Sequence, residues 1–188
     1  MHSFQCWGTS RSGSRCRVRT IRRFPYCWIH LRKYYSLAVR PSSIDGFGLG
    51  LFYVGKVNKR RGDFVAHYSG PERKTQHDID VEYGNDHQVA KYAYCTSDEN
   101  CVDSADPSKS DVGRYINSPH GTTKHANVRF SKVYHFANLA SRRKELQAAR
   151  TTPTAYGLSI IATRPIRPGD ELFIAYGPAY NFAAAQPS

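Results

Sequence analysis

The sequence predicts a mostly β fold of many short strands, preceded by a small metal-organised module and interrupted by one helical insertion. Short runs rich in Tyr, Val, Ile and Phe recur after residue 36, and clusters of Gly, Pro, Asn and Asp separate them. No two runs are joined by a convincing crossover helix, which argues against a parallel doubly wound sheet. The predicted strands are residues 36–40, 50–54, 63–68, 91–95, 128–130, 158–163 and 171–176.

Length and composition limit the number of domains and the class of protein. The 188 residues are 40% hydrophobic, which suffices for one domain with a small appendage and excludes wholesale disorder. No run of 18 apolar residues occurs, and the N-terminus lacks the apolar segment of a secretory signal, so we expect neither membrane insertion nor secretion. Five Cys without an export signal favour a reducing compartment.

The net charge of +12 is concentrated at the N-terminus. Residues 1–34 carry eight of the 27 basic residues and none of the 15 acidic ones, so this segment holds +8 of the total. The change in composition predicts a basic module at residues 1–34, a main domain at residues 36–183 and a frayed tail at residues 184–188. Because this excess suits an acidic partner, basic residues 11–33 are a candidate DNA contact.

Four metal-ligand residues lie within the basic module. Cys6, Cys16, Cys27 and His30 supply three thiolates and one imidazole, a donor set that completes a tetrahedral zinc shell. A segment this short cannot bury its own core, so a structural zinc ion would supply its folding energy. A disordered basic arm with unrelated Cys, or a disulfide arrangement, remains the alternative.

One helical segment of length is predicted, at residues 138–150, which are rich in Ala, Leu, Arg and Lys. It belongs to a basic insertion at residues 131–156 that could face a substrate, a second subunit or only solvent. Cys95 and Cys101 are left outside the ligand set, and we expect them to be buried or reduced thiols.

Four clusters in the main domain carry the candidate chemistry. The first places alternate glycines at Gly46, Gly48 and Gly50, where the absence of a Cβ lets a ligand approach the backbone. The others are a turn, strand and turn at residues 62–70, the pair 113–118 and 126–130, and residues 166–177.

In this order, the four clusters resemble the SET-domain protein lysine methyltransferases, over roughly residues 36–183. The matching segments are residues 43–52, 62–70, 114–130 and 166–177. The resemblance implies a knotted β fold in which the segment around Asn117 is threaded under a loop that ends near Tyr176. It also implies that S-adenosylmethionine binds one face and that a lysine enters a narrow channel from the other. An N-terminal Cys3His module and the lack of a Cys-rich C-terminal cap are similar to compact viral and protist members.

The resemblance also implies roles for individual residues. Tyr176 takes the catalytic position, and Asn127 is expected to stabilise the knot. For Arg114 a structural pairing with Asp170 or Glu171 is the alternative to cofactor contact. The implied cofactor-binding residues are Gly48, Leu49, Gly50, Tyr92, Arg114, Tyr115, Asn117 and Ser118. The implied lysine channel consists of Tyr68, Tyr94, Ile174, Tyr180 and Phe182.

Three positions depart from the family pattern. Ser118 replaces the usual His, Ala175 replaces the usual Asp, and Ile174 stands where many relatives carry Phe or Tyr. An apolar Ile174 leaves space in the channel, which predicts di- or trimethylation.

The predicted function is S-adenosylmethionine-dependent lysine methylation, with a histone tail or nucleosome as partner. The expected location is the nucleus or a viral replication compartment, and a homodimer is allowed. The alternative is a catalytically weak SET protein that serves as a zinc-dependent chromatin or nucleic-acid binding module. In a third interpretation the N-terminal module only braces the fold.

Overall fold

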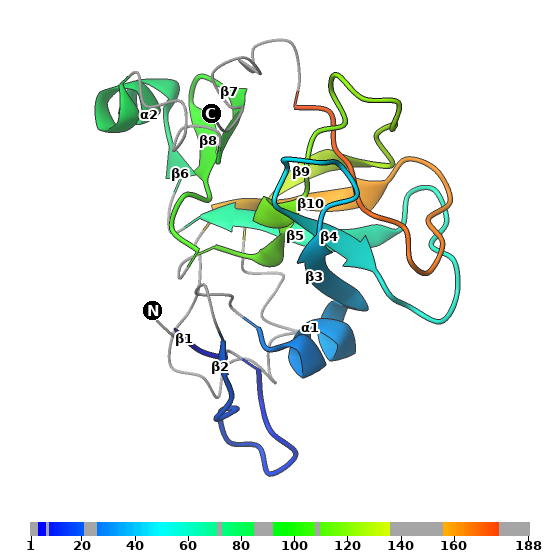
Figure 1. Cartoon of the computed structure of the whole chain (residues 1–188). Coiled ribbons are helices and arrows are strands. Elements are labelled where there is room, and N and C mark those ends of the chain that lie inside the picture. The colour runs from blue at the N-terminus through cyan, green and yellow to red at the C-terminus, as the bar shows by residue number, and fades with distance from the viewer. Residues whose placement is uncertain are drawn as a thin grey trace.

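The computed structural model describes residues 4–6, 8–20, 26–70, 73–84, 92–107, 110–135 and 156–176. Strands dominate these residues, and they form four small sheets (Figure 1). The mostly β fold is therefore confirmed. Neither of the two α-helices in the described residues has the length or the apolar character to cross a membrane.

The N-terminal module precedes the main domain without a flexible break. Strand β1 (Phe4–Gln5) pairs antiparallel with β2 (Arg19–Thr20), and helix α1 (Trp28–Tyr35) follows. Ser36 ends the helix with a positive φ of 57°, a left-handed cap that turns the chain directly into the next strand. Tyr26 and Leu31 are buried in the same cluster as Leu37 and Leu51 of the main domain. The module therefore shares the core of the domain that follows it.

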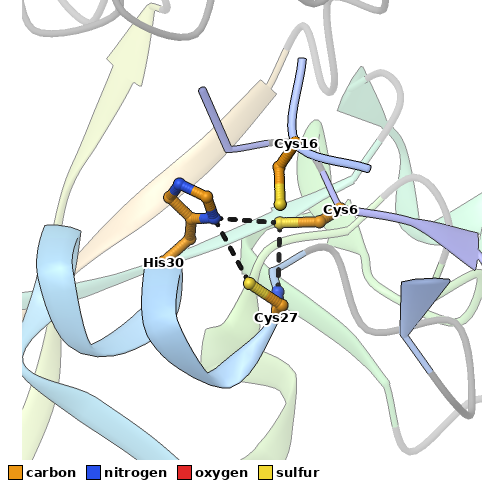
Figure 2. A group of neighbouring side chains, drawn as sticks. All are labelled: Cys6, Cys16, Cys27 and His30. Carbon is orange, nitrogen blue, oxygen red and sulfur yellow. Dashed lines mark hydrogen bonds between the residues drawn. The ribbon is translucent and has the colours of Figure 1, made fainter. Parts of the chain in front are cut away.

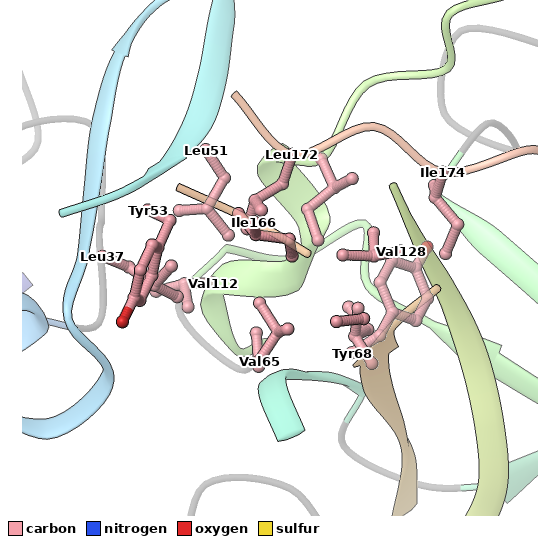
Figure 3. Close-up of a cluster of buried hydrophobic side chains, with 14 of the residues drawn as sticks. Leu37, Leu51, Tyr53, Val65, Tyr68, Val112, Val128, Ile166, Leu172 and Ile174 are labelled. Atoms are coloured by element: carbon pink, nitrogen blue, oxygen red, sulfur yellow. The ribbon is translucent and has the colours of Figure 1, made fainter. Parts of the chain in front are cut away.

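Two antiparallel sheets form the centre of the main domain. Strands β3 (Leu37–Pro41) and β4 (Leu49–Tyr53) make a hairpin in which Leu37 lies opposite Tyr53. Strands β5 (Phe64–Gly70), β10 (Tyr156–Ala162) and β9 (Val128–His135) form a sheet in that order. Apolar side chains from both sheets bury together, and Figure 3 shows them converging between the strands. This burial is the main stabilising term of the fold.

The sequence predicted only one strand of the third sheet, residues 91–95, and missed its other two strands and the helix beside them. Strands β6 (Arg73–Lys74), β8 (Asn100–Asp103) and β7 (Ala93–Ser97) pair in that order, and α2 (Gln76–Tyr83) packs beside them. Thr75 begins α2 with a capping box that it shares with Asp78.

The expectation that Cys95 and Cys101 are thiols is wrong in this structure. The two residues lie directly opposite each other on β7 and β8, with their Cα atoms 3.9 Å apart, and they form a disulfide. Sequence spacing alone could not give this pairing, because it depends on the register of the two strands.

A threaded segment joins the sheets. The 3₁₀ helix η2 (Val112–Tyr115) leads to Asn117, which makes a parallel bridge with Phe173, while Val128 makes another with Ile174. The chain near Phe173 therefore lies between the segment at Asn117 and the start of β9 at Val128, and both of these precede it in the sequence. This is the threaded arrangement expected of the knotted fold.

Six of the seven predicted strand regions overlap observed strands. The seventh, residues 171–176, forms isolated bridges through Glu171, Phe173 and Ile174 in place of a named strand. The predicted helix at residues 138–150 lies outside the described residues, as does the tail.

Candidate functional site

Three thiols and one imidazole meet in the N-terminal module. Cys6 and Cys16 lie at the two ends of one loop. Cys27 precedes α1, and His30 lies in the first turn of that helix. All four side chains are buried. Their donor atoms lie within 4.8 Å of one another, and Figure 2 shows them facing a common centre. Tetrahedral zinc with Zn–S near 2.3 Å and Zn–N near 2.0 Å holds its ligands roughly 3.4–3.8 Å apart. The cluster is therefore close to the spacing that tetrahedral zinc requires.

Neighbouring groups already orient these ligands. His30 Nε2 donates to the Thr9 carbonyl over 2.8 Å, which leaves Nδ1 facing the sulfurs, 3.2 Å from Cys27 Sγ. The Cys6 sulfur accepts from the amides of Gly8 and Cys27. Burial raises the pKa of the Cys6 thiol to about 12, although those two amides oppose the shift.

Two glycines shape the loop between the first two ligands. Gly13 has a φ of +80°, which suits a residue without a Cβ. Gly8 is required for a different reason, because a Cβ there would lie 2.2 Å from the His30 ring.

The buried side-chain amide of Asn127, the residue before β9, holds the chain at residues 171–173 in place. Asn127 Nδ2 donates to the Glu171 carbonyl over 2.8 Å, and its Oδ1 accepts from the Phe173 amide over 2.9 Å. Asn127 therefore serves as a bridge inside the knot.

Glu171 is a site residue that sequence reasoning missed. One carboxylate oxygen accepts from the Ser42 hydroxyl over 2.7 Å and the other from the Ser43 amide over 2.7 Å. Asn117 Nδ2 lies 3.4 Å from the same carboxylate, and a Cβ on Gly50 would overlap it. The buried Glu171 side chain therefore joins Asn117 to the loop of Gly46, Gly48 and Gly50, here called the glycine loop. The partners of Glu171 lie too far away in sequence to be foreseen.

Removing the Glu171 carboxylate should loosen the whole site. We expect Glu171→Ala to lower the free energy of unfolding by about 3 kcal/mol, because the donors of Ser42 and Ser43 lose their buried acceptor. Glu99→Ala, at an exposed carboxylate, is the matched control and should change stability by less than about 0.5 kcal/mol. Urea unfolding of both variants measures the difference, and equal stability would contradict the role given to Glu171.

Asn117 and Tyr176 lie at the centre of the site. Asn117 Nδ2 donates to the Leu49 carbonyl over 3.0 Å, which attaches the threaded segment to the glycine loop. The Tyr176 hydroxyl donates to the Ile116 carbonyl over 2.7 Å. Because the hydroxyl has one proton, its oxygen can serve another group only as an acceptor.

Arg114 lies between two aromatic rings. Its guanidinium is 4.3 Å from the Tyr92 ring centre and 5.6 Å from that of Tyr115, and Nη1 donates to the Ala105 carbonyl. The suggested pairing with Asp170 or Glu171 is not found in the described residues, since Glu171 is engaged by Ser42 and Ser43. Nε of Arg114 is buried and finds no acceptor among the described residues.

The rings of Tyr68, Tyr94 and Phe130 pack together and are here called the aromatic group. Phe130 is 4.0 Å from the Tyr94 ring centre and 5.2 Å from that of Tyr68. Tyr68 donates its hydroxyl to the Tyr92 carbonyl, and burial raises its pKa above the ordinary range. Strand alternation places Phe130 on the same face of β9 as Val128, which bridges Ile174. Phe130 was not among the predicted channel residues.

The remaining predicted residues divide into two groups. Ser118 is buried directly after Asn117, and Gly48 has a φ of +67° with no protein atom within 4 Å of an added Cβ. Tyr180 and Phe182 lie outside the described residues.

Comparisons with known proteins identify the pattern. Residues 48–177 match the family model for the SET domain. The Chaetomium thermophilum polycomb repressive complex 2 in an autoinhibited conformation, bound to S-adenosylmethionine, is similar at a TM-score of 0.54 and 20% identity, covering 78% of this chain and 16% of that one. A crystal structure of the same fungal complex gives 0.53 and 22%, covering 78% and 16%.

An active polycomb repressive complex 2 in the basal state gives a TM-score of 0.51 at 20% identity, covering 76% of this chain and 15% of that one. The chain thus spans about one sixth of these structures, and at such identity the likeness shows the fold alone. No curated protein matches the chain.

Proposed function

This chain belongs to the SET-domain family, because residues 48–177, more than half of the chain, match the SET-domain model, and we propose that it is an S-adenosylmethionine-dependent protein lysine N-methyltransferase. One observation carries the proposal most strongly. Threading brings the Tyr176 hydroxyl onto the carbonyl of Ile116, the residue before Asn117, while Asn117 is bonded to the glycine loop. The segment of Ile116 and Asn117 is thereby bonded to both the Tyr176 hydroxyl and the loop that we propose binds the cofactor.

The described residues fit the cofactor. S-adenosylmethionine carries a carboxylate, and Arg114 offers a half-buried guanidinium whose buried Nε–H has no acceptor among the described residues. The glycine loop presents an uncovered backbone at Gly48, and Asn117 is held beside Leu49. When bound, the cofactor supplies a methyl group on a sulfonium.

The aromatic group of Tyr68, Tyr94 and Phe130 suits a lysine side chain. Its rings take the apolar stem out of water and disfavour the ammonium, which lowers the pKa of the entering amine. Only the neutral amine has the lone pair needed to accept a methyl group. The Tyr176 oxygen then accepts a hydrogen bond from the amine and orients it, which is catalysis by positioning.

We propose histone in nucleosomes as the substrate, which places the protein in the nucleus or a viral replication compartment. The basic residues 11–33 would repel an isolated basic tail, whereas they suit the DNA around which nucleosomal histones are wrapped. We propose that the Cys3His group holds a structural zinc ion, because its donor set and spacing fit that metal.

A specific observation favours a second candidate function. Ser118 and Ala175 depart from the family pattern, which suits a catalytically weak chromatin-binding protein. Calorimetric titration with S-adenosylmethionine separates the two, with Asn117→Ala as the control that should lose affinity. Absence of binding by the unmodified chain would favour the binding module.

The channel should allow more than one methyl group per lysine. Ile174, two residues before Tyr176, brings no hydroxyl toward it, so this position does not restrict the rotation of the amine. We expect a saturated reaction to yield di- or trimethyllysine by mass spectrometry. Ile174→Tyr, which adds a hydroxyl, should favour monomethyllysine, and Ile174→Phe is the matched control. Monomethyl product alone from the unmodified chain would refute this.

A further inference from the structure

Among the described residues of the N-terminal module, three large apolar side chains are exposed to solvent. Trp28 is 74% exposed, Ile29 is 48% exposed and Val18 is 44% exposed. A tryptophan rarely stays so exposed without a partner, because burying it removes a large apolar area from water. These three residues are here called the Trp28 surface.

The Cys3His group holds the two parts of the Trp28 surface near each other. The Cys6 amide donates to the Val18 carbonyl over 3.0 Å, and the Cys27 amide donates to the Cys6 sulfur over 3.1 Å. The backbones of Val18 and of Cys27, the residue before Trp28, are therefore both bonded to Cys6, so the positions of Val18 and Trp28 depend on the metal-ligand cluster.

The charged side chains that the module itself places beside the Trp28 surface are all basic. Arg17 and Arg19 flank Val18, while Arg32 and Lys33 follow Trp28 and Ile29 by one helical turn, and all four are exposed. Residues 1–34 contain no Asp or Glu, so no acidic side chain within the module neutralises them.

We propose that the Trp28 surface binds duplex DNA, with Arg17 and Arg32 on phosphates and Trp28 packed against sugars or a base step. The regular negative charge of a duplex complements the exposed basic residues of a module whose sequence contains no acids, and exposed aromatic or apolar side chains insert into the minor groove in other DNA-binding proteins. The inference rests on the proposed nucleosomal substrate, because DNA contact would offset the repulsion between this module and a basic histone tail.

Fluorescence anisotropy of the full chain with a labelled mixed-sequence duplex tests the proposal, in the absence of cofactor and histone. We expect affinity to fall steeply between about 50 and 200 mM salt. Arg17→Gln with Arg32→Gln should make the log–log salt slope shallower by roughly two. Trp28→Ala should weaken binding about fivefold or more at every salt concentration and leave the slope unchanged.

Matched controls lie in the main domain. Lys56→Gln with Arg61→Gln removes two exposed charges, and Val57→Ala truncates a side chain that is 73% exposed. Both should leave DNA affinity within twofold. The proposal is overturned if the controls lose as much affinity as the module variants. It is also overturned if an acidic polypeptide competes as well as the duplex and, in addition, Trp28→Ala has no effect. Methyl transfer to histone is measured separately, so DNA binding and the proposed activity can fail independently.

Discussion

Tyr176→Phe should lower methyl transfer roughly a hundredfold with little change in fold stability. The substitution removes the hydroxyl that donates to the Ile116 carbonyl and that would orient the incoming amine. The loss should appear in kcat, with cofactor affinity nearly unchanged, because the hydroxyl acts on the amine. Transfer of tritiated methyl to nucleosomes measures the rate.

Tyr53→Phe is the matched control for this substitution. Tyr53 also donates its hydroxyl to a backbone carbonyl, that of Val57 over 2.7 Å, but it lies away from Asn117. This variant should keep most of its activity. Equal losses in the two variants would show that Tyr176 acts through stability and would contradict a catalytic role.

Loss of the metal should have the second large effect. We expect His30→Ala to abolish zinc binding and to lower the free energy of unfolding by about 3 kcal/mol or more. The effect should reach beyond the module, because Tyr26 and Leu31 pack in the same core as Leu37 and Leu51. For a domain of this size the melting temperature would fall by roughly 10 °C.

His77→Ala is the control for the metal experiment, because His77 is exposed on α2. It should keep one zinc ion per chain and its melting temperature. Zinc content by mass spectrometry and thermal unfolding by circular dichroism measure both properties. An unmodified chain that contains no zinc and is unaffected by chelators would contradict the metal assignment.

The short-range features of the sequence were the easiest to predict. Cys27 and His30 lie one helical turn apart, and Cys6 and Cys16 enclose a short loop. Local geometry therefore brings together the two ligands of each pair. The strand regions could be located by their composition, although their bounds moved by a few residues. Helix α2 was missed, even though Thr75 and Asp78 form a capping box, because eight residues show too little periodicity.

Long-range features needed the structure. Glu171 reaches Ser42 across 129 residues, and nothing in its own segment indicates that contact. The disulfide of Cys95 and Cys101 depends on strand register, and the stacking of Arg114 between Tyr92 and Tyr115 depends on the threaded segment. Local propensity carries none of this information, since each contact depends on tertiary packing. The threading itself was expected only through resemblance to a family.

Site mapping of a methylation reaction tests the central proposal most directly. The unmodified chain is incubated with S-adenosylmethionine and reconstituted nucleosomes, and the histones are then analysed by peptide mass spectrometry. The proposed function predicts methyl groups on one or a few histone lysines, with strongly reduced modification by Tyr176→Phe. Histones that stay unmodified, by a chain shown to be folded and to bind zinc, would contradict methylation of nucleosomes by this protein.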